Sequence, residues 1–125
     1  MNRIRLADTR ESITHTVIIY AEDREYEFTF TVGFYPDGRP GEVFIELEKD
    51  SSKLAGTYGC FGVAISMLLQ STWTLADLAR KFAHQRFAPE GMTNNKEIPF
   101  AKSPVDYLFR WLTEHMKGKS NDIIG

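Results

Sequence analysis

The sequence has 125 residues, a net charge of −2 and 13% aromatic residues. This length allows one domain with a core of its own, and the aromatic content excludes a disordered tail. The single cysteine, Cys60, excludes an internal disulfide. No secretory signal or long apolar run is present, so we expect a cytoplasmic protein with no membrane partner.

The near-neutral total hides an uneven distribution of charge. Residues 22–50 carry nine acidic and three basic residues, whereas residues 78–118 carry seven basic and four acidic residues. This split predicts one face that favours anions and another that repels them. An ordinary solvated surface is the alternative.

The first half of the chain predicts an arm followed by strands. Residues 1–11 are charged and aperiodic, which indicates a loose N-terminal arm. Apolar and polar residues then alternate over 12–20, 26–32 and 43–48, as in half-buried strands. Their short polar connections predict an antiparallel meander of three strands, with a turn at Gly38 that needs positive φ.

At residue 53 the apolar spacing changes to that of a long helix. Gly56, Gly59 and Gly62 recur within it, although each glycine costs up to about 1 kcal/mol of helix stability relative to alanine. A smooth ridge against the sheet, another helix or a second subunit would explain them. The ridge and the open edges of a small sheet predict a homo-oligomer.

Two further helices follow. Thr74 predicts the N-cap of a short helix that reaches about His84, and Ser103 caps a third helix that has Pro104 at its first position. Residues 85–101 are rich in Pro, Gly and Asn and indicate a long ordered loop. We therefore predict a single α+β domain over residues 12–116, with three helices on one face of the sheet and a polar tail at 117–125.

No catalytic constellation is evident. The three histidines lack metal-ligand spacing, and the apolar neighbours of Cys60 favour a buried, inert thiol. We therefore expect no enzymatic activity, no metal and no cofactor. Acid–base catalysis by a pair of carboxylates is an alternative that the sequence leaves open, although no feature favours it.

Residues 80–110 interleave bases, amides and aromatic side chains. Arginine can bind phosphate with its two-pronged guanidinium, phenylalanine can stack on a base, and asparagine can bind a base or ribose edge. Alternatively, the phenylalanines belong to the core, Arg86 and Arg110 pair with Glu90 or Asp106, and the asparagines form turns. Both interpretations stay open from the sequence.

Three stretches carry a resemblance to a known family: VGFYPDGRPGEVFIEL at 32–47, FGVAISMLLQ at 61–70 and KFAHQRFAPEGMTNNKEIPFAKSPVDYLFRWL at 81–112. In their order and spacing they resemble the small TSCPD domain near the C-terminus of adenosylcobalamin-dependent ribonucleotide reductases. The barrel, radical cysteine and redox cysteines of those enzymes have no counterpart here. The resemblance therefore implies an accessory or assembly module that contacts a ribonucleotide reductase in trans.

In size and build the chain also resembles, more loosely, the phage proteins that counter Thoeris immunity by sequestering cyclic nucleotide or cyclic ADP-ribose signals. This second resemblance implies a non-catalytic sponge that binds a nucleotide-derived small molecule rather than a nucleic acid polymer. It is our leading hypothesis, and the reductase module is the alternative. The implied ligand contacts are Arg86, Phe87, Thr93, Asn94, Asn95 and Arg110.

Overall fold

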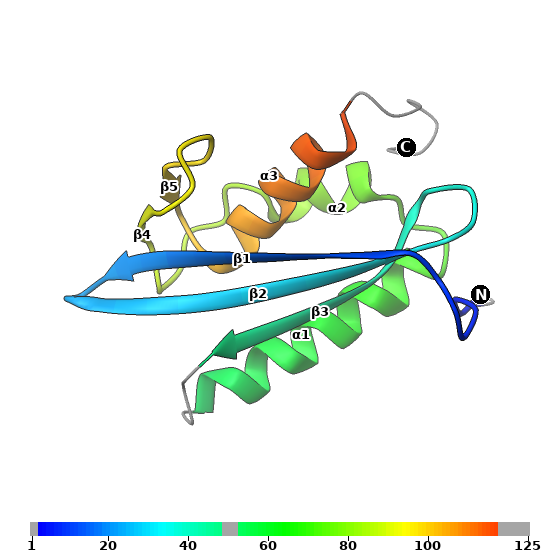
Figure 1. Cartoon of the computed structure of the whole chain (residues 1–125), viewed down its shortest axis with the longest axis horizontal. Helices are drawn as coiled ribbons and strands as arrows, with labels where there is room; N and C mark the ends of the chain where they lie inside the picture. Colours follow the sequence, from blue (N-terminus) through cyan, green and yellow to red (C-terminus); the bar gives the residue numbers. More distant parts are fainter. Residues whose placement is uncertain (1–2, 49–52, 118–125) are drawn as a thin grey trace.

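The computed structural model describes residues 3–48 and 53–117 (Figure 1). Its centre is one antiparallel sheet with the strand order β3-β2-β1-β4-β5. The strands are β1 (Ser12–Ala21), β2 (Arg24–Phe34), β3 (Pro40–Glu48), β4 (Gly91–Thr93) and β5 (Phe100–Ala101). The helices are α1 (Lys53–Leu69), α2 (Leu75–Phe82) and α3 (Pro104–Met116). The predicted α+β class is confirmed.

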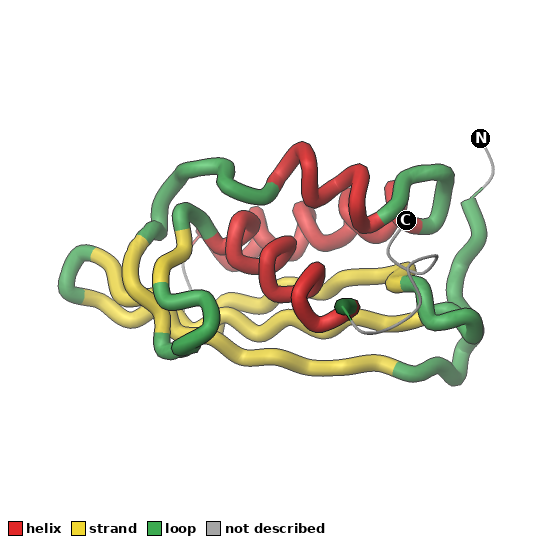
Figure 2. Tube along the Cα trace, turned by 90° about the horizontal axis from the view of Figure 1, so that it is seen from above, coloured by secondary structure: helices red, strands yellow, loops and turns green. Residues whose placement is uncertain are grey.

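The three helices lie on one side of the sheet (Figure 2). Alternation along most of β1, β2 and β3 turns one face of the sheet towards the helices and buries that face. The ring of Phe28 meets Tyr58 of α1 edge-on, and the ring of Phe30 stacks on Tyr107 of α3. The largest fully buried side chains are Tyr107, Phe28, Phe30, Phe109, Ile19 and Ile65.

The predicted helix starts are confirmed. Thr74 and Asp77 form a reciprocal capping box at the start of α2, and the Ser103 hydroxyl accepts a hydrogen bond from the Asp106 backbone at the start of α3. The predicted turn at Gly38 is also confirmed, because this residue has φ 94. Each of these signals is local, so the sequence alone could provide it.

The predicted antiparallel meander is confirmed as β1, β2 and β3, but the sheet has two further strands, which lie in the predicted long loop at 85–101. Gly91–Thr93 forms β4 beside the end of β1, and Phe100–Ala101 forms β5 beside β4. These strands are three and two residues long, too short to show alternation. The part of β1 before Ile18 has no strand neighbour on that side among the described residues.

Helix α1 covers the outer edge of β3. The Ser66 hydroxyl accepts a hydrogen bond from Val43 N at 2.8 Å, and Gln70 Nε2 donates to Gly41 O at 3.0 Å. Gly62 allows this approach, since a Cβ there would lie 2.9 Å from Val43 O. Side chains of α1 thus take the place of a neighbouring strand along part of this edge.

The other two glycines of the predicted ridge behave differently. A Cβ added at Gly56 or Gly59 would meet no atom of the other described elements within 4 Å, so of these three glycines Gly62 alone packs closely against the described part of the chain. Cys60, on the same side of α1, is exposed. The expectation of a buried thiol is therefore wrong, because its apolar neighbours belong partly to an exposed helix face.

The predicted loose arm is tied to the domain in the part that the structure describes. Ile4 N donates to Gln70 O at 2.8 Å, and Arg3 Nε donates to the Gln70 side chain at 2.6 Å. The Tyr35 hydroxyl in turn donates to Ile4 O. Most of the predicted polar tail, residues 118–125, lies outside the described residues.

The face of the sheet away from the helices carries much of the acidic charge. Glu27 lies opposite Glu48 in the β2–β3 register, and Glu25 and Glu46 follow two residues away on the same face. These acidic side chains of the acid-rich segment therefore lie on the sheet face opposite the helices. Among the described residues, no helix is long and apolar enough to cross a membrane.

Candidate functional site

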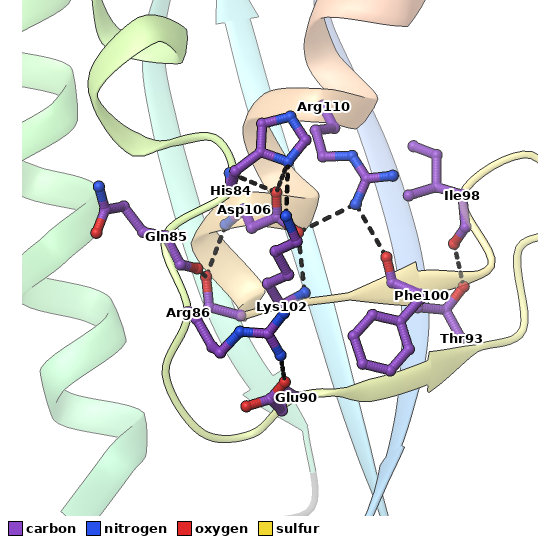
Figure 3. A network of polar contacts seen from close by, with 11 residues as sticks. His84, Gln85, Arg86, Glu90, Thr93, Ile98, Phe100, Lys102, Asp106 and Arg110 are labelled. Carbon is purple, nitrogen blue, oxygen red and sulfur yellow. Dashed lines mark hydrogen bonds and ion pairs between the residues drawn. The ribbon is translucent and has the colours of Figure 1, made fainter.

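A buried carboxylate organises the region where α2, β5 and α3 meet (Figure 3). Asp106 is fully buried, and it accepts hydrogen bonds from His84 N at 2.6 Å and Lys102 N at 2.9 Å. Arg110 Nη1 adds a third, charge-assisted bond at 3.1 Å. Burial of a carboxylate is costly unless it is paired, so these donors hold the three elements together.

His84 sits above this carboxylate in an unusual backbone conformation. Its φ of 69 lies in the left-handed region that most residues avoid, and the bond from its N–H to Asp106 holds it there. Its imidazole is exposed, with Nδ1 3.4 Å from Lys102 Nζ and 3.8 Å from Asp106 Oδ1. Two basic side chains therefore meet solvent directly over the buried acid.

The predicted contacts Arg86 and Phe87 lie at the outer rim of this network. Arg86 pairs with Glu90 four residues on, and 57% of its side chain is exposed. Phe87 is exposed, and its N–H donates to Lys102 O at 3.0 Å. Both residues meet solvent, yet neither lines the cavity described below.

The predicted contacts Thr93, Asn94 and Asn95 are engaged in the β4–β5 loop. The Thr93 hydroxyl donates to Ile98 O at 2.5 Å. Asn94 continues the pairing with β1, since its N–H donates to Ile18 O and its Oδ1 accepts from Ile18 N. Asn95 forms a turn through Oδ1, which accepts from the Glu97 backbone, so the amides shape the loop.

Arg110 is the predicted contact that reaches a cavity. Its Nη1 donates to Phe100 O at 2.9 Å and to Asp106. The cavity, of about 490 Å³, lies between the end of α2, the outer side of α3 and the β4–β5 loop. The buried Thr113 hydroxyl at its wall has no hydrogen-bond partner in the described part of the chain. The polar lining is His84, Glu97, Arg110, Thr113 and Glu114.

The six predicted residues therefore do not converge on one pocket, and their role in ligand binding stays a prediction. His84, Lys102 and Thr113 were not among the predicted contacts, and Asp106 was expected to be a capping residue or the ion-pair partner of an arginine. The cap at Ser103 and Pro104 placed Asp106 correctly, but its bonds to residues 84 and 102 depend on tertiary structure. Among the described residues, no cluster of His, Cys, Asp and Glu could hold a metal.

A second polar chain lies beneath α3. His15 Nε2 is 2.7 Å from the Tyr107 hydroxyl, and the His15 ring stacks on Trp111 at 4.5 Å. Burial lowers the pKa of His15, and repulsion from His115 lowers it further. Burial also raises the pKa of Tyr107. Both groups are therefore neutral near pH 7 and act within the core.

Comparisons with known proteins give one consistent result. A family model described as the TSCPD domain matches residues 4–116, which includes part of the predicted arm. The Vitamin B12-dependent ribonucleotide reductase of Rhodopirellula baltica is 47% identical over 110 residues, which are 88% of this chain and 10% of that protein. No solved structure matches.

Other relatives carry the same description at lower identity. The protein of Streptomyces avermitilis is 38% identical over 110 residues, and that of Bradyrhizobium diazoefficiens is 32% identical over 111 residues. In each case the match covers 88% of this chain, but only 11% and 8% of the relatives, respectively. The chain thus spans about a tenth of the length of these curated relatives.

Proposed function

The chain belongs to the TSCPD domain family, and from this membership we propose that it serves as an accessory module of a ribonucleotide reductase. The observation that carries the proposal is the extent of the match. It covers 88% of this chain but 10% of the reductase from Rhodopirellula baltica, so the shared part is this one domain. The proposed role is binding and assembly, without a catalytic step in this domain.

The network around Asp106 suits such a role. It fixes the end of α2, the start of α3 and β5, so the surface above it is rigid before any partner arrives. That surface presents His84, Lys102 and Arg86, and the acidic sheet face lies elsewhere. A partner surface with exposed carboxylates would complement it.

The test supplies this chain to a reductase that lacks its own copy of the domain. The matching 110 residues are removed from the Rhodopirellula baltica relative, and this chain is added as a separate protein. We expect a complex in sedimentation velocity experiments and partial recovery of ribonucleotide reduction. Absence of both a complex and recovery at tens of micromolar would contradict the proposal.

A matched pair of variants locates the contact. Arg86 and Arg80 each form an exposed ion pair with an acid three or four residues away in the chain. Arg86→Ala should weaken the complex several-fold because it removes a cation from the proposed surface, whereas Arg80→Ala should not. Equal effects of the two substitutions would place the contact away from the Asp106 network.

A nucleotide-binding function is the second candidate, and the cavity beside Arg110 favours it. The guanidinium of Arg110 can bind an anion, and the unpartnered Thr113 hydroxyl offers a further contact. The relatives support the reductase module better than the anti-defence sponge, for which they provide no support. Nucleotide binding would also be compatible with a module of a reductase.

Calorimetric titration tests this candidate. The probes are deoxynucleoside triphosphates, cyclic oligonucleotides and cyclic ADP-ribose isomers. Thr113→Val keeps the shape of the side chain and removes the hydroxyl, so it should weaken binding without lowering stability. If no probe binds the wild-type protein below about millimolar concentration, this candidate is wrong, while the reductase proposal keeps its own test.

A further inference from the structure

The exposed side of α1 is unusual for a surface helix because it carries no charge. After Lys53 the helix contains no acidic or basic residue. Amphipathic surface helices normally turn charged and polar residues to solvent. The exposed residues here are Leu54, Gly56, Thr57, Gly59, Cys60, Val63, Ala64 and Met67. Such a contiguous uncharged surface indicates a covered interface.

The two halves of this surface have opposite shapes. The first half is smooth, because Gly56 and Gly59 face open space. The second half is raised, because Val63 is 59% exposed, Met67 is 46% exposed and Phe44 of the adjacent β3 is 48% exposed. The span from Gly56 to Met67 is about 16 Å at the usual helical rise. The raised half of one copy is therefore the complement of the smooth half of another.

The charges beyond the two ends of α1 are also opposite. Near its C-terminal end, Arg3 and Arg5 line a cavity of about 550 Å³ together with Val63 and Phe44. The cavity is also lined by Asp8 and by the Arg10–Glu42 ion pair, so its net charge is positive. The side chain of Arg5 makes no hydrogen bond or ion pair with the described residues. Near its N-terminal end lies the end of β3, where Glu46 and Glu48 lie on the sheet face away from the helices. An antiparallel partner would bring its acidic end to these arginines.

We propose that α1 is the interface between two copies of this chain, which pack antiparallel about a two-fold axis near the middle of the helix. In this arrangement Gly56 and Gly59 of each copy receive Val63 and Met67 of the other. A two-fold interface must be complementary to itself, and the shape of this surface fulfils that condition, with opposite net charges beyond its two ends. The inference does not depend on the proposed function.

The first experiment measures the mass of the full chain by sedimentation equilibrium. The wild-type protein should have about twice its chain mass of 14.3 kDa at tens of micromolar. Val63→Glu should give a monomer, because it places a charge in the centre of the interface. The control is Met92→Glu on β4, which changes an equally exposed apolar residue and should leave the dimer intact.

The substitution Gly56→Leu tests the proposed interface without disturbing the packing of the single chain. A Cβ at Gly56 would meet no atom of the other described elements within 4 Å, and leucine is the better helix former. The substitution should therefore not lower the free energy of unfolding of the monomer. The added side chain would fill the smooth half of the interface and should raise the dissociation constant of the dimer at least tenfold. A monomeric wild-type protein overturns the proposal, and so does a dimer that both Val63→Glu and Gly56→Leu leave unchanged.

Cys60 provides an independent readout, because it is exposed on the same surface and is the single cysteine of the sequence. A short bis-maleimide should link two copies into one dimeric species, with no larger product. The yield should fall together with dimer content in Val63→Glu. Equal cross-linking of the wild type and the monomeric variant would show that the thiols meet by collision, which contradicts the proposed interface.

Discussion

The side-chain amide of Asn95 donates a hydrogen bond to the hydroxyl of Tyr107 over 2.8 Å. This contact fixes the β4–β5 loop to a fully buried residue of α3. The Tyr107 hydroxyl also meets His15 of β1, so three separate segments share one oxygen atom. Asn95 was predicted as a ligand contact, and the structure shows in addition that its side chain has a hydrogen-bond partner within the chain.

We predict that Asn95→Ala lowers the free energy of unfolding by at least about 1 kcal/mol, because it removes the bond to Tyr107 and also the turn bond from the Glu97 backbone. Tyr107→Phe removes the same bond from the other side. A double-mutant cycle in urea denaturation should therefore show that the two effects are not additive. Full additivity would mean that the contact contributes nothing to stability.

The glycines of α1 should respond in opposite ways to alanine. Gly62→Ala should destabilise the protein, because the new Cβ would lie 2.9 Å from Val43 O. Gly59→Ala meets no atom within 4 Å and should stabilise the monomer by up to about 1 kcal/mol through helix propensity. Denaturation at a concentration where the protein is monomeric measures both effects. Stabilisation by Gly62→Ala would show that the helix can move away from β3.

The turn before β3 gives a third test. Gly38→Val should cost at least about 1–2 kcal/mol, because φ 94 disfavours a residue with a Cβ, and a β-branched one most of all. Asp37→Ala removes an exposed bond from Arg39 N at 3.0 Å and should cost less. Equal melting temperatures for the two variants would contradict the assigned turn geometry.

Acidification should weaken the fold through His15. Its pKa is lowered in the folded protein, chiefly by burial, so below about pH 6.5 the unfolded chain binds a proton that the folded chain excludes. This contribution to stability is complete above the unfolded pKa and is lost as the pH falls towards the lowered folded value. In denaturation at pH 7 and pH 5, His15→Gln should show a smaller loss than the wild type. An equal loss in both would assign the pH dependence to other groups.

The sequence predicts those features whose signals lie within a few neighbouring residues. Alternation revealed β1 to β3, and the caps at Thr74 and Ser103 placed α2 and α3. The short β4 was missed because its pairing with β1 joins residues far apart in the chain. The exposure of Cys60 was missed because an uncharged helix face is identical in sequence whether the chain itself or a partner covers it.

The candidate site was less predictable than the fold for the same physical reason. Arg86, Asn94 and Arg110 were predicted either to bind a ligand or to bond within the chain, and from the sequence both were open. The structure shows bonds within the chain for all three, and ligand binding stays a prediction. Only the folded arrangement shows Asp106 beneath His84 and a Thr113 hydroxyl that has no hydrogen-bond partner among the described residues. Residue type therefore indicated the region, and tertiary contacts were needed to define its geometry.

The pairing of Ile19 with Thr93 has a consequence for synthesis on the ribosome. The two residues are 74 positions apart (93 − 19), so β1 leaves the ribosome long before β4, the strand that pairs with its end. The hairpin of β1 and β2, then β3 and α1, can assemble in order as the chain lengthens. Until β4 arrives, the end of β1 offers unpaired backbone groups to other nascent chains, which makes this the stage most exposed to misassembly.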